Sequence, residues 1–543
     1  MARDNSPFGE GGNHHNADNS YTNQVNTPIK VDRLARWLEG YDESLKNYLI
    51  VGFSEGFRVG FSGEATSKIY KNHNSALTQP KLIEKYIKKE IEAGRILGPF
   101  DSPPKIFHCA PIGLVPKKDK DQFRVIHDLS YPPGQSVNDY IPPEKTAVSY
   151  DSVYDAIYML ASVADAAFMA KTDIQNAFRI IPIHPDDQHL FCMHWQNYFY
   201  IDTAMQMGCS SSCQIFQAFS SAVKWIAQHK LNIPNVSYLD DFLLGSKSKL
   251  LGESKLAEFI DMCTDIGVPI SKKKTFRPNR VMTFLGIEID SERREVRLPK
   301  EKIEQCTREI QNLIGCKKTR LKTLQSAIGL LNFACQVVLP GRAFLRRLID
   351  LTRGKLKPYH FLKLASAIDD LKIWLQFLNN HNGRIFFVDE QFITNHEIQL
   401  FTDASGTLGY GAVFGKSWFN GKWSEWWLTQ HIMIKELYPI VVAIEVWGPL
   451  LKNKRLTLCT DNLSLVPVLT KHTSKDRLVM VLVRRLVLTA LLNNIVIDAY
   501  HISSQKNILS DSLSRLQVAK FRQLNPGANK LPERIPALPV SLS

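Results

Sequence analysis

NVSYLDDFLLGS, residues 235–246, places two adjacent aspartates between two apolar runs. Apolar residues on both sides of a short polar break are typical of a β-hairpin, so we expect Asp240 and Asp241 to occupy its tight turn. Two neighbouring carboxylates repel each other, and a divalent cation that prefers oxygen ligands would offset that repulsion. An ordinary aspartate-containing turn has the same local sequence, so a second element is needed to decide between the two.

KTDIQNAFRI, residues 171–180, supplies that element, because it places Asp173 at the end of a short apolar strand. A fold that brings this strand beside the hairpin gathers three carboxylates. Such a set could hold two Mg²⁺ ions about 3.5–4 Å apart, an arrangement suited to in-line displacement at phosphorus. Mn²⁺ accepts the same oxygen ligands, so the sequence leaves the choice of metal open.

Four more acids stand at strand ends and helix starts in the last third of the chain. Asp403 ends the strand expected in LFTDASGTLGYGAVFG, and Asp461 ends the one in LCTDNLSLV. Glu436 lies near the start of a helix, and Asp511 begins a short one. Each acid alone has an ordinary explanation as a helix cap or a solvated group. The four together predict a second site for divalent metal ions.

Length and periodicity predict several domains of mixed α/β and α+β class. The 543 residues exceed what one hydrophobic core normally serves, and 44% of them are hydrophobic. In the last third we expect three successive strands, in EIQLFTD, GYGAVFG and KWSEWWL, followed by alternating helices and strands. The expected segments are a disordered tail (1–30), a leader (31–75), a mixed domain (76–290), a helical connector (291–390), an α/β domain (391–516) and an unfolded basic tail (517–543).

The charge balance favours a polyanionic partner such as nucleic acid. Lys and Arg total 67 against 53 acids, which gives a net charge of +14 and a pI near 9.2. A surface that is simply basic would give the same numbers. The sequence has nine cysteines without a Cys-x-x-Cys pair, no long apolar run and no signal-like N-terminus. These features predict an intracellular protein without membrane segments, and they leave the choice between cytoplasm and nucleus open.

A set of ordered motifs resembles the reverse transcriptases of retroelements. The resemblance implies a right-hand polymerase with fingers, palm and thumb, which uses an RNA template, a DNA primer and dNTPs. It also implies that Asp173, Asp240 and Asp241 are the metal ligands. The motifs are, in chain order, GLVPKKDKDQFRVIHDLS (113–130), KTDIQNAFRI, MQMGCSSSCQIFQ (205–217), YLDD (238–241), VPISKKKTF (268–276) and FLGIEID (284–290).

The same resemblance implies roles for residues that bind the nucleotide. Lys117 and Arg124 match the positions that hold the triphosphate, and cationic side chains there would neutralise phosphate oxygens. Phe178 matches the aromatic that excludes a ribose 2′-hydroxyl, although a core phenylalanine fits its spacing equally well. Met207 stands before Gly208, where many relatives have Gln, so the contact there would be apolar.

Further roles follow for residues after the hairpin. Lys273 is our choice for the lysine that gives a proton to the leaving pyrophosphate, with Lys272 and Lys274 beside it in the same run. Phe284, Leu285 and Gly286 would begin the hairpin that holds the primer end. The basic helices from about 300 to 355 would form the thumb and the connection and follow the phosphate backbone.

The last third resembles ribonuclease H, whose Asp-Glu-Asp-Asp site corresponds to Asp403, Glu436, Asp461 and Asp511. Two metal ions there would hydrolyse the RNA strand of an RNA-DNA hybrid. HISSQKNILSD (501–511) offers His501 as a mobile proton shuttle, but this histidine closes an apolar strand, and we do not assign it that role. Asn507 is the better choice for a supporting polar contact.

The segments 34–57 and 331–352 resemble those of DIRS-type retrotransposons, which encode a tyrosine recombinase. That recombinase is not visible here and would be encoded separately. A processed fragment of a gypsy-like polyprotein would look similar, although no Asp-Thr-Gly or Asp-Ser-Gly protease signature is present. Two other classes remain as alternatives. They are a domesticated, non-catalytic nucleic-acid-binding scaffold, which the presence of all seven acids disfavours, and a polymerase that copies DNA templates.

Overall fold

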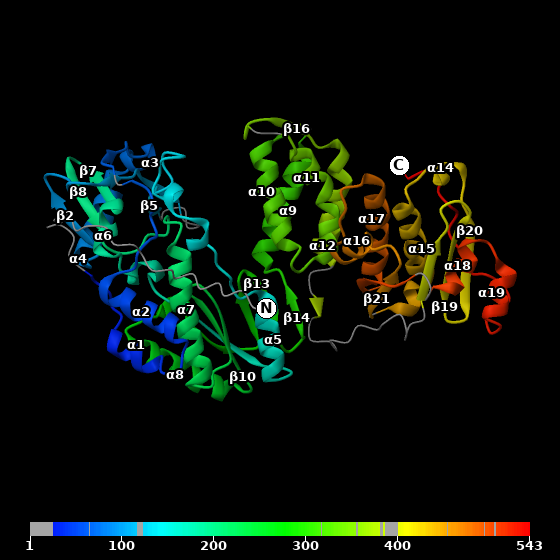
Figure 1. The fold of residues 1–543 in the computed structure, drawn as a ribbon, viewed down its shortest axis with the longest axis horizontal. Coiled ribbons are helices and arrows are strands. Elements are labelled where there is room, and N and C mark those ends of the chain that lie inside the picture. Colours follow the sequence, from blue (N-terminus) through cyan, green and yellow to red (C-terminus); the bar gives the residue numbers. More distant parts are fainter. Residues whose placement is uncertain are drawn as a thin grey trace. The chain divides into compact units, whose positions relative to one another are not determined.

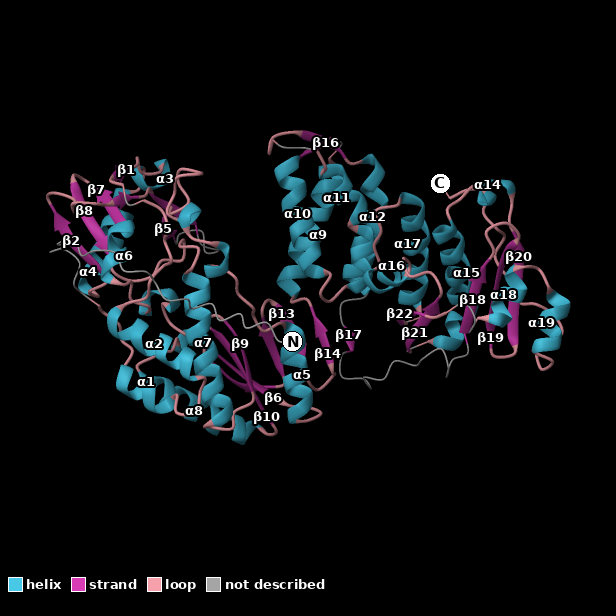
Figure 2. Ribbon diagram, viewed as in Figure 1, coloured by secondary structure: helices cyan, strands magenta, loops and turns pink. Residues whose placement is uncertain are grey.

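The computed structural model describes residues 25–64, 66–116, 123–316, 318–354, 357–380, 384–385, 400–452, 454–493, 495–503 and 507–542 (Figures 1 and 2). They form two compact units. The first consists of Met1–Leu285 with Ile289–Arg294, and the second of Gly286–Glu288 with Glu295–Ser543. Among the described residues, every helix is too short or too polar to cross a lipid bilayer.

The first unit is built around a four-stranded antiparallel sheet. Its order is β11 (Phe276–Asn279), β6 (Phe168–Asp173), β10 (Asp241–Ser246) and β9 (Asn235–Tyr238). Residues 242–246 of β10 are all buried, and since successive side chains of a strand point to opposite faces, both faces of this sheet are covered. The covering helices are α5 (Val153–Val163), α7 (Ser212–His229) and α8 (Lys249–Ile266).

Local sequence explains where these helices begin and end. Ser152 and Asp155 form a capping box at the start of α5, in which each side chain accepts the other residue's backbone N–H. The Ser248 side chain caps α8 by accepting from Leu251 N, and Gly267 ends that helix in the left-handed conformation, at φ +91°.

A second sheet of the first unit has the order β1-β3-β7-β8-β2. Beside it lie a two-stranded antiparallel pair and two helices, whose apolar residues Ile83, Ile87, Ile112 and Leu114 pack together. The bounds are β1 (Lys68–Ile69), β2 (Ile96–Phe100), β3 (His108–Cys109), β7 (Cys192–Trp195) and β8 (Tyr198–Asp202) in the sheet, β4 (Ile112–Pro116) and β5 (Phe123–His127) in the pair, and helices α3 (Asn74–Leu77) and α4 (Pro80–Glu92).

The leader packs against this unit through helices α1 (Val31–Trp37) and α2 (Glu43–Glu55). The disordered tail predicted for residues 1–30 is wrong for residues 25–30, while 1–24 lie outside the described residues. The Asn26 amide donates to the carbonyls of Ala93 and Gly94, and the Lys30 N–H donates to the Ile266 carbonyl. These hydrogen bonds to distant segments hold residues 25–30 in place, whereas the composition of that stretch alone did not predict an ordered structure.

The second unit begins with a helical part. Its helices are α9 (Lys300–Gly315), α10 (Leu321–Ala334), α11 (Arg346–Thr352) and α12 (Ile368–Asn380). An antiparallel pair, β15 (Lys318–Arg320) and β16 (Phe361–Lys363), joins two of its connections. The strands before and beside these helices are β12 (Val281–Phe284) in the first unit, β13 (Ile287–Asp290), which the two units share, and β14 (Glu295–Arg297) and β17 (Arg384–Ile385) in the second.

The rest of the second unit is the expected α/β arrangement. Strands β18 (Leu400–Ala404), β19 (Gly409–Phe414) and β20 (Ser417–Lys422) are antiparallel, and β21 (Arg455–Thr460) pairs in parallel with β22 (Val496–His501). The helices are α14 (Glu425–Leu428), α15 (Ile432–Trp447), α16 (Val466–Lys471), α17 (Arg477–Leu492), α18 (Ile508–Ser514) and α19 (Val518–Leu524).

The third strand of this part was predicted in the wrong place. The prediction put it in KWSEWWL, but a tight turn at Gly415 starts β20 immediately after β19, with Phe414 paired to Ser417. Trp423 and Trp427 instead follow the strand, where their rings stack with centroids 5.1 Å apart in an aromatic cluster. Aromatic residues are buried in strands and in short helices alike. The aromatic run in KWSEWWL therefore led the prediction to place the strand there.

The unfolded tail predicted for residues 517–543 is also wrong. Helix α19 buries Phe521 against Trp418, with ring centroids 5.2 Å apart. Beyond it, the Asn529 and Pro539 carbonyls accept hydrogen bonds of 2.8 Å from the indole N–H groups of Trp418 and Trp427. The partners of this segment are about 110 residues earlier in the chain, so its own sequence could not reveal them.

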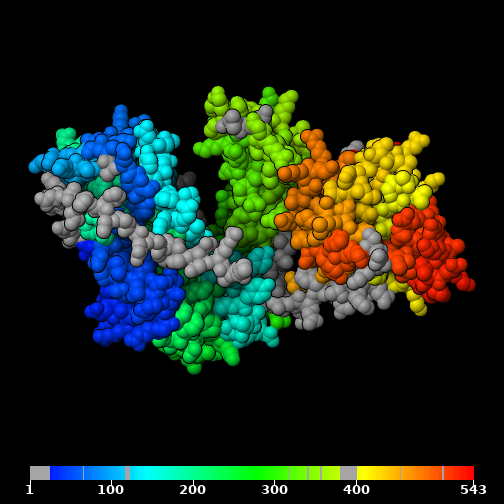
Figure 3. Space-filling model, viewed as in Figure 1, coloured from blue at the N-terminus to red at the C-terminus, as the bar shows by residue number. Residues whose placement is uncertain are grey.

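Shorter helices complete the fold, and Figure 3 shows the surface that the described elements form. They are α6 (Pro185–Gln188) and the 3₁₀ segments η1 (Asn138–Tyr140), η2 (Pro143–Lys145), η3 (Ala177–Ile180), η4 (His189–Phe191), η5 (Lys272–Lys274), η6 (Leu339–Phe344), η7 (Ala365–Ala367) and η8 (Gly448–Leu451).

Candidate active sites: two clusters of carboxylates

The first cluster forms where β6 meets the β9–β10 hairpin. Leu239 and Asp240 make the turn, and Asp241 opens β10. In the antiparallel register, Asp241 stands directly opposite Asp173, the last residue of β6. The Ile174 N–H also donates to the Asp240 carbonyl at 2.9 Å. Residues directly opposite on neighbouring strands have Cβ atoms about 4.5–5.5 Å apart, so the fold places the three carboxylates together.

The electrostatics of this cluster favour a bound cation. Burial raises the pKa of Asp173 to about 6, and the charges of Asp240 and Asp241 add to that rise. Burial, followed by the charge of Asp241, raises the pKa of Asp240 as well. Two lysines partly offset the negative charge, with Lys274 Nζ 2.7 Å from Asp173 and Lys171 Nζ 3.1 Å from Asp241. Oxygen ligands that repel one another suit a divalent metal ion.

Lys274 is the member of the lysine run that reaches the carboxylates. The Ser271 N–H donates to the Asp173 carbonyl at 2.8 Å, which fixes the register of η5 beside β6. No hydrogen bond or ion pair joins Lys273, the residue chosen from the sequence, to another described residue. The run of three identical residues contained no signal that could separate them, because the choice depends on a backbone contact with β6.

Three of the residues expected to bind a nucleotide lie near one another. The Arg124 guanidinium is 3.0 Å from the Met207 sulfur, and the Met207 side chain is 56% exposed. A Cβ on Gly208 would lie 2.7 Å from the His127 carbonyl oxygen, so only glycine permits this close approach. Lys117 lies outside the described residues.

Gln206, one place away from the expected position, is turned into the protein. Its side chain is 8% exposed and donates to the Asp202 carboxylate. Met207 therefore presents the accessible side chain next to Gly208, as the sequence register predicts. Phe178 is also buried, at 8% exposure, and its ring contacts Phe216 with centroids 5.4 Å apart.

The residues expected to hold the primer form the turn between β12 and β13. Phe284 is fully buried, whereas Leu285 and Gly286 both have positive φ, at +49° and +79°. A Cβ on Gly286 would lie 3.1 Å from the Phe333 ring. The absence of a side chain at this position therefore allows the ring to pack closely against the backbone.

The second cluster brings together Asp403 at the end of β18, Glu436 in α15 and Asp461 after β21. One carboxylate oxygen from each lies within 4.8 Å of the others. Burial raises the pKa of Glu436 to about 9, and the charges of Asp403 and Asp461 raise it further. Burial also raises the pKa of Asp403 to about 6. Two buried carboxylates and one partly buried carboxylate at this spacing fit a divalent cation, which would offset the cost of burying their negative charges and their mutual repulsion.

Asp511 stands beside this cluster but not within it. Its carboxylate accepts a 2.8 Å hydrogen bond from Arg515, and its charge contributes to the raised pKa of Asp403. Asn507 supports the cluster as expected, with its amide 2.8 Å from the Thr402 carbonyl and 3.5 Å from the Asp403 carboxylate.

Sequence reasoning missed Ser514, whose hydroxyl donates to the Asp403 carboxylate. The available signal was its position three residues after Asp511, on the same face of α18. His501 lies at the end of β22, where its Nε2 is 3.1 Å from the Asp461 backbone carbonyl. That contact places the imidazole beside Asp461.

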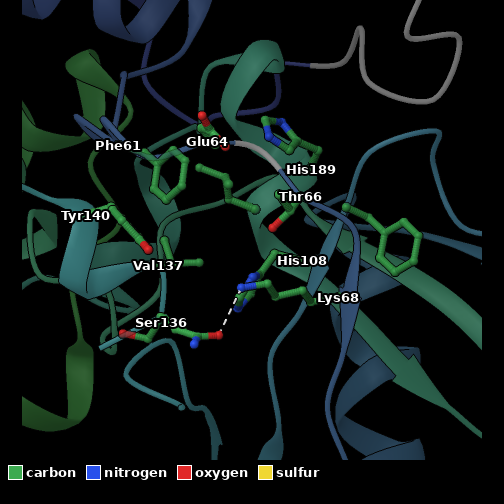
Figure 4. A pocket seen from close by; sticks show the side chains of 12 residues that line it. Phe61, Glu64, Thr66, Lys68, His108, Ser136, Val137, Tyr140 and His189 are labelled. Atoms are coloured by element: carbon green, nitrogen blue, oxygen red, sulfur yellow. Dashed lines mark hydrogen bonds between the residues drawn. The ribbon is translucent and has the colours of Figure 1, made fainter. Parts of the chain in front are cut away.

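Figure 4 shows a cavity of about 290 Å³ in the first unit, where Lys68 and His108 lie across from Tyr140, and Lys68 contacts Gln135 at 3.4 Å. None of the described acids of either cluster lines this cavity.

Comparison with known families identifies the segment that carries the first cluster. Residues 112–289 match the family described as reverse transcriptase (RNA-dependent DNA polymerase). This segment is therefore similar to reverse transcriptase domains. All three acids of the first cluster fall inside the matched range.

Related proteins are retroviral polyproteins. The Gag-Pol polyprotein of Walleye dermal sarcoma virus is 27% identical over 195 residues, which are 36% of this chain and 10% of the polyprotein. The Pro-Pol polyprotein of Feline foamy virus is 32% identical over 182 residues, 32% of this chain and 14% of the polyprotein. The chain thus spans a small part of the length of these relatives.

Solved structures share the fold over more of the chain. A foamy viral protease-reverse transcriptase in complex with double-stranded DNA matches with a TM-score of 0.51 at 16% identity, over 90% of this chain and 84% of that one. A foamy viral protease-reverse transcriptase with an RNA/DNA hybrid matches with a TM-score of 0.50, over 91% of this chain and 65% of that one. At such low identity, the likeness concerns the fold alone.

Proposed function

We propose that this protein is an RNA-directed DNA polymerase with a C-terminal ribonuclease H that hydrolyses the RNA strand of the RNA-DNA hybrid. The observation that carries the first activity is the pairing of Asp173 with Asp241 across β6 and β10, inside the segment that matches the reverse transcriptase family. The observation that carries the second is the carboxylate cluster of Asp403, Glu436 and Asp461.

At the first site, Asp173, Asp240 and Asp241 would hold two Mg²⁺ ions. When bound, the ions supply activation of the primer 3′-hydroxyl and charge neutralisation at the triphosphate. Lys274 would give a proton to the leaving pyrophosphate, the role assigned to Lys273 from the sequence, and its contact with Asp173 supports this choice.

The side chains around this site would select and hold the nucleotide. Arg124 would neutralise phosphate oxygens, together with Lys117. Phe178 would lie under the sugar and exclude a 2′-hydroxyl, and Met207 with Gly208 would give an apolar contact to the nucleotide. Phe284, Leu285 and Gly286 would hold the primer end.

At the second site, Asp403, Glu436 and Asp461 would hold the metal ions, with Asp511 as a further ligand from α18. When bound, the ions supply an activated water and stabilise the leaving 3′-oxygen of the RNA strand. Ser514 and Asn507 would keep the Asp403 carboxylate in position. Mn²⁺ could replace Mg²⁺ at both sites, because the ligands are all oxygen atoms.

The domain assignments follow from these roles. Residues 76–290 would form the fingers and palm, 291–390 the thumb and connection, and 391–516 the ribonuclease H domain, with the leader at 31–75 preceding them. Packing of α19 and the residues after it on Trp418 and Trp427 supports extending the last domain through 542. The RNA template, DNA primer and dNTPs would be the ligands of the first activity.

We infer further that the chain comes from a DIRS-type retrotransposon, on the basis of the segments 34–57 and 331–352. A tyrosine recombinase encoded separately by the same element would then act with it. Co-expression of a candidate recombinase and recovery of both proteins on element DNA would test this partnership.

Primer extension on an RNA template tests the polymerase. We expect Mg²⁺-dependent extension by the wild type and none by Asp240→Asn/Asp241→Asn. Hybrid cleavage tests the nuclease, and Asp461→Asn should abolish cleavage while leaving extension intact. Each variant is the control for the other, because the two substitutions lie in different clusters.

The same assays separate the alternatives. Extension that survives the double substitution would contradict the assigned mechanism. An inactive wild type that binds RNA firmly would favour a non-catalytic scaffold. Extension on DNA templates only would favour a polymerase without an RNA-copying role.

A further inference from the structure

The β15–β16 pair lies at an end of the α9–α10 helices (Figure 1). It carries three cationic side chains and one aromatic ring on one face. In its antiparallel register, Lys318 pairs with Lys363, and Arg320 pairs with Phe361. Between them, Thr319 and Leu362 are 7% and 6% exposed and point into the unit. Since side chains alternate along a strand, the other four all lie on the outer face. We call Lys318, Arg320, Phe361 and Lys363 the tip face.

The tip face carries unbalanced positive charge. Lys318 and Lys363 are directly opposite, and like charges in this position destabilise a strand pair. Neither lysine, nor Arg320, has a carboxylate of the described residues within 4.0 Å, although ion pairs are common elsewhere in this unit. A bound anion would relieve this repulsion.

Exposed aromatic rings lie among these cations. Phe361 is 63% exposed, with the Arg320 guanidinium 5.8 Å from its ring centroid. Tyr359, two residues earlier, is 61% exposed and has Lys357 Nζ 6.0 Å from its ring. Aromatic faces beside cations are the surface that stacks unpaired bases and holds the phosphates between them.

A groove continues from the tip face across the start of α10. It has a volume of about 480 Å³, and its lining includes Arg320, Lys322 and Tyr359, with Glu309 as its one acid. The N-terminus of α10 does not supply the anion site, because the Leu321 and Lys322 N–H groups already donate to the carbonyls of His360 and Pro358, at 2.7 and 3.0 Å. Binding therefore depends on the cationic and aromatic side chains.

We propose that the tip face and this groove bind single-stranded nucleic acid. The strand's phosphates contact Lys318, Arg320 and Lys363, and its unpaired bases stack on Phe361 and Tyr359. A duplex shields its bases within the stack, so it could use the cations but not the rings. This binding needs neither a divalent metal ion nor a nucleotide, and it does not depend on the proposed polymerase.

The test is fluorescence anisotropy of the full chain in EDTA with a labelled 12-nucleotide oligo(U), and with a blunt 20-base-pair duplex. Phe361→Ala should weaken oligo(U) binding about tenfold and leave duplex binding unchanged, because one stacked base is lost. Lys318→Ala/Lys363→Ala should reduce the slope of log K against log salt by about 1.4, since each phosphate contact on a single strand contributes about 0.7.

Matched controls separate this site from other effects. Arg353→Ala/Lys372→Ala removes the same charge from ion-paired residues of the same unit and should leave the slope unchanged. Lys318→Arg/Lys363→Arg should retain binding. The binding assay contains neither dNTP nor a divalent metal ion, so a failure of the polymerase proposal leaves its result intact.

A second measurement locates the bound strand directly. Photocrosslinking with an oligonucleotide that contains 5-iodouridine should modify the segment 357–363, which mass spectrometry would identify. Absence of this crosslink, an unchanged salt slope in the lysine variant, or an equal loss of single-strand and duplex binding in Phe361→Ala would each overturn the proposal.

Discussion

Lys274 Nζ donates a 2.7 Å hydrogen bond to the carboxylate of Asp173, although 101 residues separate them in the sequence. The contact exists because the Ser271 N–H donates a hydrogen bond to the Asp173 carbonyl, which brings η5 alongside β6. The Lys274 side chain remains 61% exposed, so it can move away from the carboxylate when a metal ion binds there.

This geometry predicts different roles for two adjacent lysines. Lys274→Ala should lower kcat for primer extension by about 10²-fold, the usual contribution of a positioned proton donor. Lys273→Ala should extend at close to the wild-type rate, because its side chain makes no contact with the described acids. Steady-state extension with saturating dNTP would measure both, and equal losses in the two variants would contradict the assignment.

Glu436→Gln should raise the stability of the metal-free protein at pH 7.5. The carboxyl has a pKa of about 9 in the fold against 4.5 when unfolded, chiefly because it is buried. The folded state therefore binds the extra proton between these values, and wild-type stability falls as pH rises from about 4.5 to 9. Gln removes this loss, so the variant's thermal transition should depend less on pH, as measured by calorimetry in EDTA.

Addition of Mg²⁺ provides the complementary result. A metal at 100 times its Kd stabilises the wild type by about 2.7 kcal/mol, and Glu436→Gln should lose most of that gain together with hybrid cleavage. Polymerase activity should persist and serves as the control for folding. Equal Mg²⁺ stabilisation of both proteins would place the metal elsewhere.

His127 should make the first unit sensitive to acid. Burial lowers the pKa of its imidazole to about 4 from 6.5, so between these values the unfolded chain binds a proton that the folded chain does not. Stability is therefore retained above pH 6.5 and lost as pH falls toward 4, by roughly 3 kcal/mol at most. His127→Gln should flatten the dependence of denaturation midpoint on pH in this window. An unchanged slope would show that the imidazole is not the group responsible.

Deletion of residues 526–543 should destabilise the second unit. The deletion leaves the buried indole N–H groups of Trp418 and Trp427 without their carbonyl acceptors, and each such loss costs about 1–3 kcal/mol. We expect a lower thermal transition and a red shift of tryptophan emission. Leu531→Ala, at a residue 79% exposed, is the matched control and should change neither. A truncated protein with unaltered emission would contradict the packing described for this segment.

The sequence alone located the elements whose signals are local. Apolar runs around Asp240 and Asp241 predicted the hairpin, and the acids at the ends of β18 and β21 and within α15 were found from the strands and helix that carry them. Such features can be predicted because a strand, helix or turn is specified by the pattern of apolar and turn-forming residues within a few neighbouring positions.

Only the tertiary structure decided which distant groups meet. It brought Lys274, rather than its two identical neighbours, to Asp173, added Ser514 to the second cluster, and ordered residues 25–30 and 518–542. Each of these outcomes depends on hydrogen bonds or packing between segments far apart in the chain. The free energy that stabilises these contacts depends on a partner segment, and the local sequence of one segment does not specify its partner.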